Sequence, residues 1–269
     1  MNADSGRIEG LFNALCSDRR ALLDPPACPE DGAAIWARAG VVVEPGTGRL
    51  LVATGDGAWD GDRFWGDSVL ELMPGAAGLA GSFTPSNYEE LEEADVDLGS
   101  TAPAILNDRL VVQGGKEGVL YLLDLSRMRS DLGATGGAVQ RISTPGGDAV
   151  FSAPAVLRTG DETWLFVANG SATTAYRLTG GRLAAAWANE TPGTSPVVAG
   201  GLLYVFDPAG GRLNVYRPQS GRRIAALPAG SGHWNSPIVV AGRIALPEGD
   251  ANAHETSGVL DVYRLSSSG

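Results

Sequence analysis

The fold of this chain is decided by residues 195–227, SPVVAGGLLYVFDPAGGRLNVYRPQSGRRIAAL. Four short apolar runs, rich in Val, Leu, Ile, Tyr and Phe, are separated here by turns that contain Gly, Pro, Asp and Ser. Apolar runs that alternate with such turn residues, about 8–12 residues apart, predict β-strands joined by hairpins. The stretch therefore predicts one antiparallel sheet with a strand for each of the four runs.

The same order of runs recurs along the chain. Each of four clear copies opens on a serine followed closely by a proline, at Pro103, Pro154, Pro196 and Pro237. These prolines are 51, 42 and 41 residues apart. A nearly constant period of this size, with four strands in each period, is typical of the blades of a β-propeller. We predict five units, the first of them the most divergent, at about residues 36–85, 97–145, 150–190, 193–228 and 233–265.

The two ends of the chain lack matching strands. The last unit stops after a third strand that ends near Leu265, and residues 4–7 resemble the turn at 220–222 that precedes a fourth strand. Residues 1–35 are therefore expected to hold a fourth strand, at 8–15, and a loop with both cysteines. Either this strand completes the last blade, which removes an exposed edge, or the chain is a C-terminal part of a larger propeller. We favour the second explanation.

The composition agrees with a chain made largely of hairpins. Glycine makes up 38 of 269 residues, about twice its ordinary share, and one short helix is expected at residues 88–94. The net charge of −11 argues against nucleic acid as a partner, because that affinity depends on Lys and Arg side chains that neutralise phosphates. No run of 18 apolar residues is present, so no transmembrane segment is expected.

The two cysteines, Cys16 and Cys28, lie close together in an irregular stretch rich in Pro and Asp. An even pair outside a C-x-x-C spacing fits a disulfide that pins a long loop, in an oxidising compartment. Two free thiols in a cytosolic protein are the alternative.

Four strings in the first half of the chain carry a resemblance to a known family: ATGDG at 53–57, DSVLEL at 67–72, DVDLGS at 95–100 and GGKEGVLYLLD at 114–124. In this order they resemble the quinoprotein alcohol dehydrogenase-like propellers, which are named after pyrroloquinoline quinone (PQQ). The resemblance extends over about residues 36–265 and implies seven or eight blades and an extracytoplasmic location. Residues 1–7 contain no signal peptide, which favours a missing N-terminal part. Such propellers include both dehydrogenases and non-catalytic scaffolds.

The order of the strands predicts where a site would lie. If each unit runs from its inner to its outer strand, the loops that enter first strands share one rim with the loops that join second and third strands. This rim is expected to carry Gly55–Gly57, Asp97, Lys116, Asn169, Asp207, His233–Asn235 and Glu248–Asp250.

The resemblance implies three roles on this rim. Asp97, or less favourably Asp95, falls where the family has the base that takes a proton from the alcohol. Lys116 falls where a lysine polarises a quinone oxygen, and Asp56 replaces an Asn beside a calcium ion. PQQ and Ca²⁺ are thus the implied cofactors, with Asp56 and Asp97 as candidate calcium ligands. Alternatively, Lys116 is a solvated turn residue and Asp97 caps a turn.

Three further groups are candidate ligand contacts. Trp59 and Trp65 stand in a polar loop that the repeat does not require, so we expect them to contact a ligand or cofactor. His233 and His254 are the only histidines; a metal pair with nearby acids is conceivable, but rim and loop positions explain them better. The acidic stretch at 89–97 lacks the spacing of a calcium loop and is explained as solvated.

These observations predict a non-catalytic scaffold that binds a small molecule or a protein on the rim formed by Asp56, Asp97 and Lys116. Two alternatives remain open. One is a dehydrogenase for alcohols or sugars that depends on PQQ and calcium and needs upstream blades. The other is a carbohydrate-binding module, for which Trp59 and Trp65 are the support.

Overall fold

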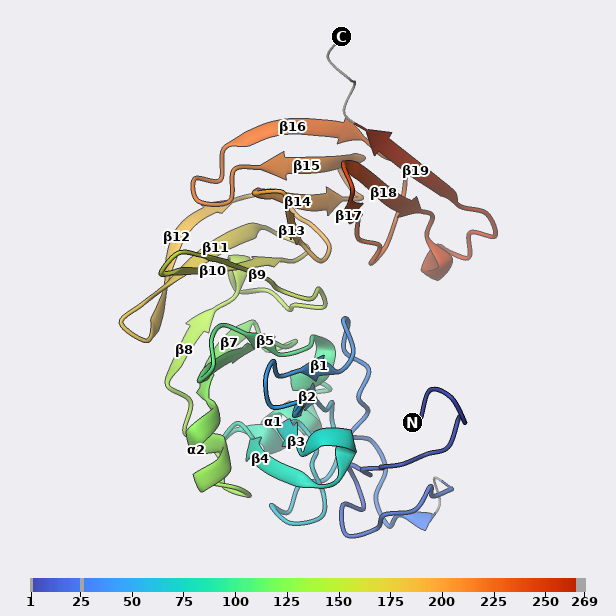
Figure 1. The fold of residues 1–269 in the computed structure, drawn as a ribbon, viewed down its shortest axis with the longest axis vertical. Helices are drawn as coiled ribbons and strands as arrows, with labels where there is room; N and C mark the ends of the chain where they lie inside the picture. The colour runs from blue at the N-terminus through green and yellow to red at the C-terminus, as the bar shows by residue number, and fades with distance from the viewer. Residues whose placement is uncertain (1, 25–26, 265–269) are drawn as a thin grey trace. The chain divides into compact units, whose positions relative to one another are not determined.

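A computed structural model describes residues 2–24 and 27–264, and its strands form successive antiparallel sheets (Figure 1). The chain divides into two compact units, residues 1–143 and 144–269. Four sheets have four strands and one has three, and every strand pairs with its neighbour in the sequence. The protein is therefore an all-β propeller with blades of antiparallel strands, as the sequence predicts.

The first unit holds two four-stranded sheets. The first sheet consists of β1 (Val42–Val43), β2 (Leu50–Ala53), β3 (Val69–Leu72) and β4 (Leu79–Phe83). The second sheet consists of β5 (Ala104–Ile105), β6 (Leu110–Gln113), β7 (Val119–Asp124) and β8 (Gln140–Ser143).

Two short helices belong to the same unit. The helix α1 (Tyr88–Glu93) confirms the one expected at residues 88–94. The helix α2 (Leu125–Ser130) was not expected, because it follows β7 without a break. It begins at this point since the Asp124 carboxylate caps it and accepts the N–H of Ser126 at 2.9 Å. Short 3₁₀ turns of the described chain lie at Pro74–Ala76, Leu98–Ser100, Pro145–Gly147 and Ala251–Ala253.

The second unit holds the remaining three sheets. Its first sheet consists of β9 (Ala155–Thr159), β10 (Glu162–Ala168), β11 (Thr173–Thr179) and β12 (Arg182–Asn189). The four runs within 195–227 form β13 (Val197–Ala199), β14 (Leu202–Asp207), β15 (Arg212–Tyr216) and β16 (Arg223–Pro228). The three-stranded sheet consists of β17 (Ile238–Val240), β18 (Arg243–Glu248) and β19 (Val259–Arg264). Leu265, the expected end of the last unit, lies outside the described residues.

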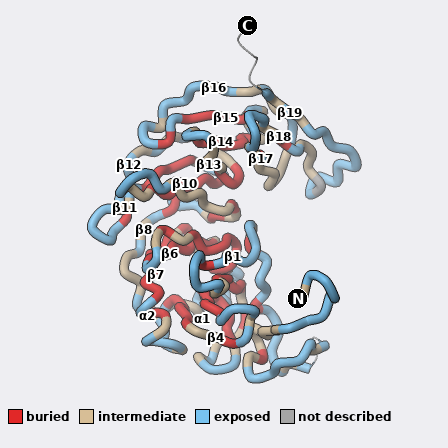
Figure 2. The backbone as a smooth tube through the Cα atoms, in the orientation of Figure 1, coloured by how far each residue is buried: buried red, intermediate tan, exposed pale blue. Residues whose placement is uncertain are grey.

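The buried residues of each unit lie mainly along its strands (Figure 2). In the first unit, Leu51 of β2 belongs to one core cluster with Val111 of β6. In the second, Phe166 of β10 belongs to a cluster with Val205 of β14. The middle strands are thus covered on both faces, and each fully buried side chain of this size contributes about 1.5–3 kcal/mol.

The N-terminal segment is irregular. The described residues before Val42 form no regular strand, so the strand expected at 8–15 and its place in a blade stay predictions. A disulfide joins Cys16 to Cys28, whose Cα atoms are 6.0 Å apart, and confirms the predicted pair.

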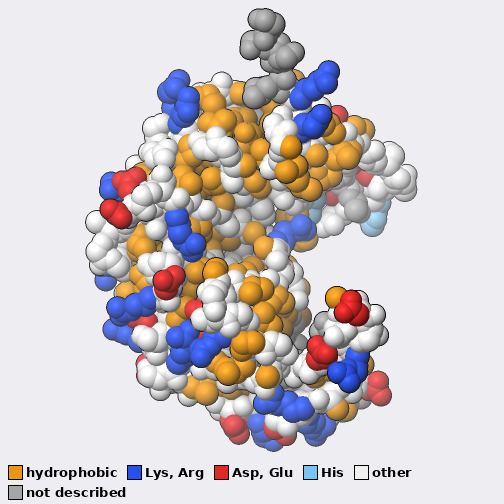
Figure 3. Space-filling model, in the orientation of Figure 1, with side chains coloured by type: hydrophobic (Ala, Val, Ile, Leu, Met, Phe, Trp, Pro, Cys, Tyr) orange, Lys and Arg blue, Asp and Glu red, His pale blue; other side chains and the backbone are white. Residues whose placement is uncertain are grey.

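The surface carries charges of both signs. On the face shown in Figure 3, basic and acidic side chains are interspersed among apolar ones, so that face presents no continuous basic surface. Within the described residues, no helix has the length and the apolar character needed to cross a bilayer. Exposed apolar side chains gather on β17 and β19, namely Ile238, Val240, Val259, Leu260 and Val262.

Candidate ligand-binding rim

Three loops of the first unit meet at one place. They follow β2, precede β5 and join β6 to β7, and they carry Asp56, Asp97 and Lys116 respectively. The Asp97 carboxylate accepts the N–H of Asp56 at 2.9 Å and pairs with the Lys116 ammonium. Gly55 permits this contact, since a Cβ atom there would lie 2.0 Å from Asp97 Oδ1. The structure thus brings together the three residues that the sequence analysis singled out.

The Lys116 ammonium is bonded entirely within the protein. Its Nζ donates to the carbonyl oxygen of Asp95 at 3.0 Å and to Asp95 Oδ1 at 2.6 Å, and it pairs with Asp97 Oδ2. An ammonium has three protons, so these three acceptors use all of its donors. Trp36, which the sequence analysis missed, lies beside it, with its ring centre 5.8 Å from Nζ.

The ionisable groups of this cluster titrate differently. Burial, together with a hydrogen bond to Asp97 and the charge of Asp97, raises the pKa of Asp56 to about 6. Burial also acts to raise the pKa of Asp97, but hydrogen bonds to Asp56 and Lys116 outweigh it and hold that pKa below its ordinary value. Burial lowers the pKa of Lys116, but hydrogen bonds to Asp95 and Asp97 outweigh it and raise that pKa. Near neutral pH, Asp97 and Lys116 are therefore both charged.

Asp67 is a further acid beside this cluster, and the sequence analysis did not single it out. It is 1% exposed, and its Oδ1 accepts the N–H of Leu98 at 2.9 Å. Its Oδ2 has no hydrogen-bond partner among the described residues. Burial, opposed by the Leu98 hydrogen bond and supported by the charges of Asp56 and Asp97, raises the pKa of Asp67 to about 7. Its place at the start of the DSVLEL string, just before the apolar residues Val69 and Leu70, was the sequence signal that could have indicated its burial.

The carboxylates suit calcium by their chemistry. Asp56, Asp95 and Asp97 each offer an oxygen within 4.8 Å of the other two, and carboxylate oxygens are ligands that Ca²⁺ prefers. Asp56 Oδ1 is buried without a hydrogen-bond partner in the described chain. Lys116 competes with such an ion, because its ammonium already pairs with Asp95 and Asp97.

The aromatic residues expected to contact a cofactor lie elsewhere. Trp65 is 1% exposed and belongs to a core cluster with Val52 and Leu70, so it packs the core rather than stacking on a ligand at the rim. Trp59 is half-buried, and its ring centre lies 4.8 Å from that of Tyr88. Since Lys116 also has no donor left, the described residues of this unit do not fit PQQ.

The rim positions predicted in the second unit stabilise their own loops. The Asn169 side-chain oxygen accepts the N–H of Ala172 at 3.0 Å, and the Asp207 carboxylate accepts the N–H of Gly210 at 2.7 Å. Both are contacts of the kind that order Asx turns.

The histidines also lie in the second unit. The ring of His233 is centred 4.2 Å from that of Trp234, and His254 is exposed. Neither histidine belongs to a group of three metal-ligating side chains in the part of the chain that the structure describes. His233 lies in the loop before β17, and His254 lies in the loop between β18 and β19.

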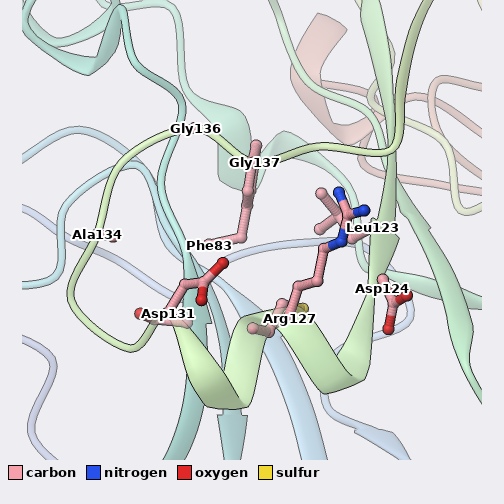
Figure 4. Close-up of a pocket in the computed structure, with 10 residues that line it drawn as sticks. Phe83, Leu123, Asp124, Arg127, Asp131, Ala134, Gly136 and Gly137 are labelled. Carbon is pink, nitrogen blue, oxygen red and sulfur yellow. The ribbon is translucent and has the colours of Figure 1, made fainter.

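A small recess lies beside α2 in the first unit. Phe83, Leu123 and Arg127 line it, with Gly136 and Gly137 on the loop that follows the helix (Figure 4). Its volume is about 10 Å³, which leaves room for about one water molecule. This recess is too small for an organic ligand.

Comparisons with known proteins agree with the fold. A chain of the "Mitotic Checkpoint Complex" is similar, with a TM-score of 0.58, 11% identity, and 85% of this chain and 61% of that chain covered. The quinohemoprotein alcohol dehydrogenase ADHIIG from Pseudomonas putida HK5 has a TM-score of 0.55 and 12% identity, with 81% and 45% covered. The dihydro-heme d1 dehydrogenase NirN in complex with DHE has a TM-score of 0.56 and 12% identity, with 84% and 44% covered.

No family model matches the chain, and no curated protein matches it in sequence. The chain spans between 44% and 61% of the length of these three proteins. At such identities the likeness concerns the fold alone, and it defines the class of this protein as a β-propeller. Two of the three structures are dehydrogenases and one is part of a protein complex, so the fold does not decide between catalysis and binding.

Proposed function

We propose that this chain is an extracytoplasmic binding scaffold, non-catalytic on its own, whose rim at Asp56, Asp97 and Lys116 contacts a small molecule or a protein. The saturated donor set of Lys116 carries the proposal. A lysine that polarises a substrate or cofactor oxygen needs a proton free to donate, and Lys116 donates to Asp95 and Asp97 only.

Asp97 is likewise engaged inside the protein. Its carboxylate accepts the N–H of Asp56 and pairs with Lys116, and these contacts hold its pKa below the ordinary value. A general base works best with a pKa near the operating pH, so Asp97 is poorly suited to take a proton from an alcohol. The contacts of Asp97 also hold the three rim loops together.

The disulfide supports the extracytoplasmic part of the proposal. Disulfides persist in oxidising compartments and are rare in the cytosol, and Cys16 and Cys28 are joined. Another chain with a similar fold is part of the Mitotic Checkpoint Complex, which supports binding only by analogy of fold.

A second candidate is the dehydrogenase that depends on PQQ and calcium and is completed by further blades. The observation that favours it is the group of three carboxylates, within which Asp56 has a pKa near 6. Asp56 and Asp97 would then hold the calcium ion, and the further blades would have to supply the contacts to PQQ. Lys116 would first have to release Asp95 or Asp97.

The single lysine makes the test direct. A chain labelled with ¹³C in lysine gives one Cε signal, which reports on Lys116 alone. We expect this signal to titrate above the ordinary lysine pKa, and to keep its position when PQQ and Ca²⁺ are added. The absorbance of the quinone is expected to stay unshifted.

Two variants complete the experiment. Asp97→Asn is expected to lower the pKa of Lys116, because it removes the charge of one ion-pair partner, whereas the exposed Asp108→Asn is expected to leave it unchanged. A shifted quinone absorbance that Asp97→Asn abolishes and Asp108→Asn retains would overturn the scaffold in favour of the dehydrogenase.

A further inference from the structure

A second, larger recess lies in the first unit and shares no residue with the carboxylate cluster. Its volume is about 320 Å³, which is at the lower end of the range for small-ligand sites. The N-terminal segment forms one wall, the loop at 60–65 forms another, and Leu79 and Leu132 come from elsewhere in the unit.

The walls of this recess are fixed by hydrogen bonds. Ser17, which follows the disulfide-bonded Cys16, accepts the indole N–H of Trp65 at 3.1 Å and donates to the carbonyl oxygen of Asp62 at 3.0 Å. The backbone N–H of Trp65 donates to the carbonyl oxygen of Ala14 at 3.0 Å. The irregular N-terminal segment is therefore tied to the first blade at this place.

The loop at 60–65 is ordered from within. Asp60 Oδ1 accepts the N–H groups of Asp62, Arg63 and Phe64 at 2.7–2.9 Å. Gly61 has a φ of +74°, and a Cβ atom there would lie 2.6 Å from the carbonyl oxygen of Gly133. The recess is thus preformed, which lowers the entropic cost of binding.

Polar groups of both signs stand at the mouth of the recess. Asp18 and Asp62 are exposed, and their carboxylates have no partner among the described residues. Arg20 uses one nitrogen on the carbonyl oxygen of Ala77, which leaves further guanidinium donors free. Arg63 is the second guanidinium of the lining. The mouth therefore has two carboxylates that accept hydrogen bonds and two guanidinium groups that donate them, and these four groups carry no net charge.

Apolar side chains line the rest of the recess. Phe12 and Leu79 are partly buried, Leu132 is 47% exposed, and the edge of the buried Trp65 completes the lining. A ligand that fits has an apolar face and a polar edge that both donates and accepts.

We infer that this recess binds a neutral polyhydroxylated ligand, namely a sugar residue. Each hydroxyl of a sugar both donates and accepts, so it pairs with the Asp18 and Asp62 carboxylates and with the Arg20 guanidinium at the same time. The C–H face of the ring packs on Phe12 and Leu79. An acidic ligand would be repelled by the two aspartates beside the arginines, and a basic ligand would be repelled by the two arginines beside the aspartates.

This inference extends the proposed binding role to a second site. The recess and the rim at Asp56, Asp97 and Lys116 share no residue, so an experiment can disprove one site without disproving the other. The test uses the full chain and saturation-transfer NMR with free glucose, galactose, mannose, maltose and trehalose, and with a glycan that ends in each sugar. Sialic acid, an anion, and ethanolamine, a cation, are the charged comparisons. We expect saturation transfer to at least one neutral sugar or glycan end, and none to the charged comparisons.

Variants assign the binding to the recess. Asp62→Asn and Arg20→Gln each remove a charged hydrogen-bonding group from the mouth, so we expect either to weaken binding of the best neutral sugar about tenfold. The exposed Asp108→Asn and Arg182→Gln are the matched controls, with affinity unchanged. Isothermal titration measures the affinities, and unfolding temperatures verify that all four variants fold.

Three results would overturn the inference. One is the absence of binding to any of the neutral sugars and glycans, and another is binding of sialic acid or ethanolamine alone. The third is binding of a neutral sugar that neither Asp62→Asn nor Arg20→Gln weakens.

Discussion

Asp67 shows how strongly one position depends on its surroundings. The residue has a φ of +42°, which Asp tolerates better than most side chains. Its buried carboxylate has only the N–H of Leu98 as a described hydrogen-bond partner. Burial therefore favours the neutral form of Asp67. In contrast, hydrogen bonds to Asp56 and Lys116 keep Asp97 ionised.

The raised pKa of Asp67 predicts a dependence of stability on pH. The pKa is 3.8 when the chain is unfolded and about 7 when it is folded, so the folded state holds an extra proton between these values. This extra proton stabilises the folded state. The stabilisation is complete below about pH 4 and is lost as the pH rises through about 7. It amounts to at most about 4 kcal/mol.

Asp67→Asn isolates this contribution. The amide oxygen keeps the Leu98 hydrogen bond and Asn accepts the positive φ, but the group no longer ionises. We expect the variant to be more stable than the wild-type protein at pH 8 and to lose this advantage at pH 4, by urea unfolding. An advantage that is equal at both pH values would contradict the raised pKa.

The helix α2 is held by an ion cluster around one buried glutamate, Glu71. Glu71 on β3 is fully buried, and Arg129 of α2 bonds both of its oxygens, Nε to Oε2 at 2.8 Å and Nη2 to Oε1 at 2.5 Å. Arg49, just before β2, donates to Glu71 Oε1 at 3.0 Å. Since α2 continues from β7 of the second sheet, this cluster connects the two sheets of the first unit.

Breaking the cluster is expected to be costly. Glu71→Gln removes the counter-ion of Arg49 and leaves Arg129 with only its longer contact to Glu44, at 3.5 Å, so we expect the free energy of unfolding to fall by about 2–3 kcal/mol. Glu162→Gln is the control, because the ion pair of Glu162 with Arg177 is exposed to solvent and is worth less than about 1 kcal/mol. Urea denaturation of both variants measures the difference, and equal losses would refute a structural role for the cluster.

The disulfide constrains the N-terminal segment, and its effect on stability can be measured. Cys16 and Cys28 are 12 positions apart, and closing a loop of about this length stabilises a protein by about 3 kcal/mol. We expect the double variant Cys16→Ser, Cys28→Ser to lose about this much, and hydrogen exchange at residues 8–24 to accelerate. Reduction of the wild-type protein should reproduce the loss. Unchanged exchange would show that hydrogen bonds alone hold the segment.

The whole molecule consists of two compact units with separate cores. Because stacked blades depend mainly on their neighbours, a substitution in one unit is expected to act chiefly within that unit. Glu71→Gln should therefore accelerate hydrogen exchange at residues 42–143 more than at residues 155–248, as measured by mass spectrometry. A uniform acceleration over both ranges would indicate that the chain opens as one cooperative unit.

Much of the fold was predictable from local patterns, and part of the rim was too. The runs within 195–227 became β13 to β16, and the turn residues between them mark the hairpins. Asp56, Asp97 and Lys116 met as expected, because loops at the same step of successive blades lie on one side. The helix α2 was missed, since a helix of six residues has too little periodicity to detect. Trp65 was misplaced for a related reason: a polar loop sequence does not reveal that its aromatic residue turns inward.

The sequence by itself determined the propeller class, the blade period and the disulfide pair, because each depends on residues close together in the chain. Only the tertiary structure decided that Lys116 donates all its hydrogen bonds to Asp95 and Asp97. The same is true of the neutral form that Asp67 favours. It is also true of the recess beside the N-terminal segment, which is lined by acidic and basic side chains. These properties depend on burial and on contacts between distant residues, such as Asp56 and Asp97, 41 positions apart. Such contacts exist only once the blades are stacked.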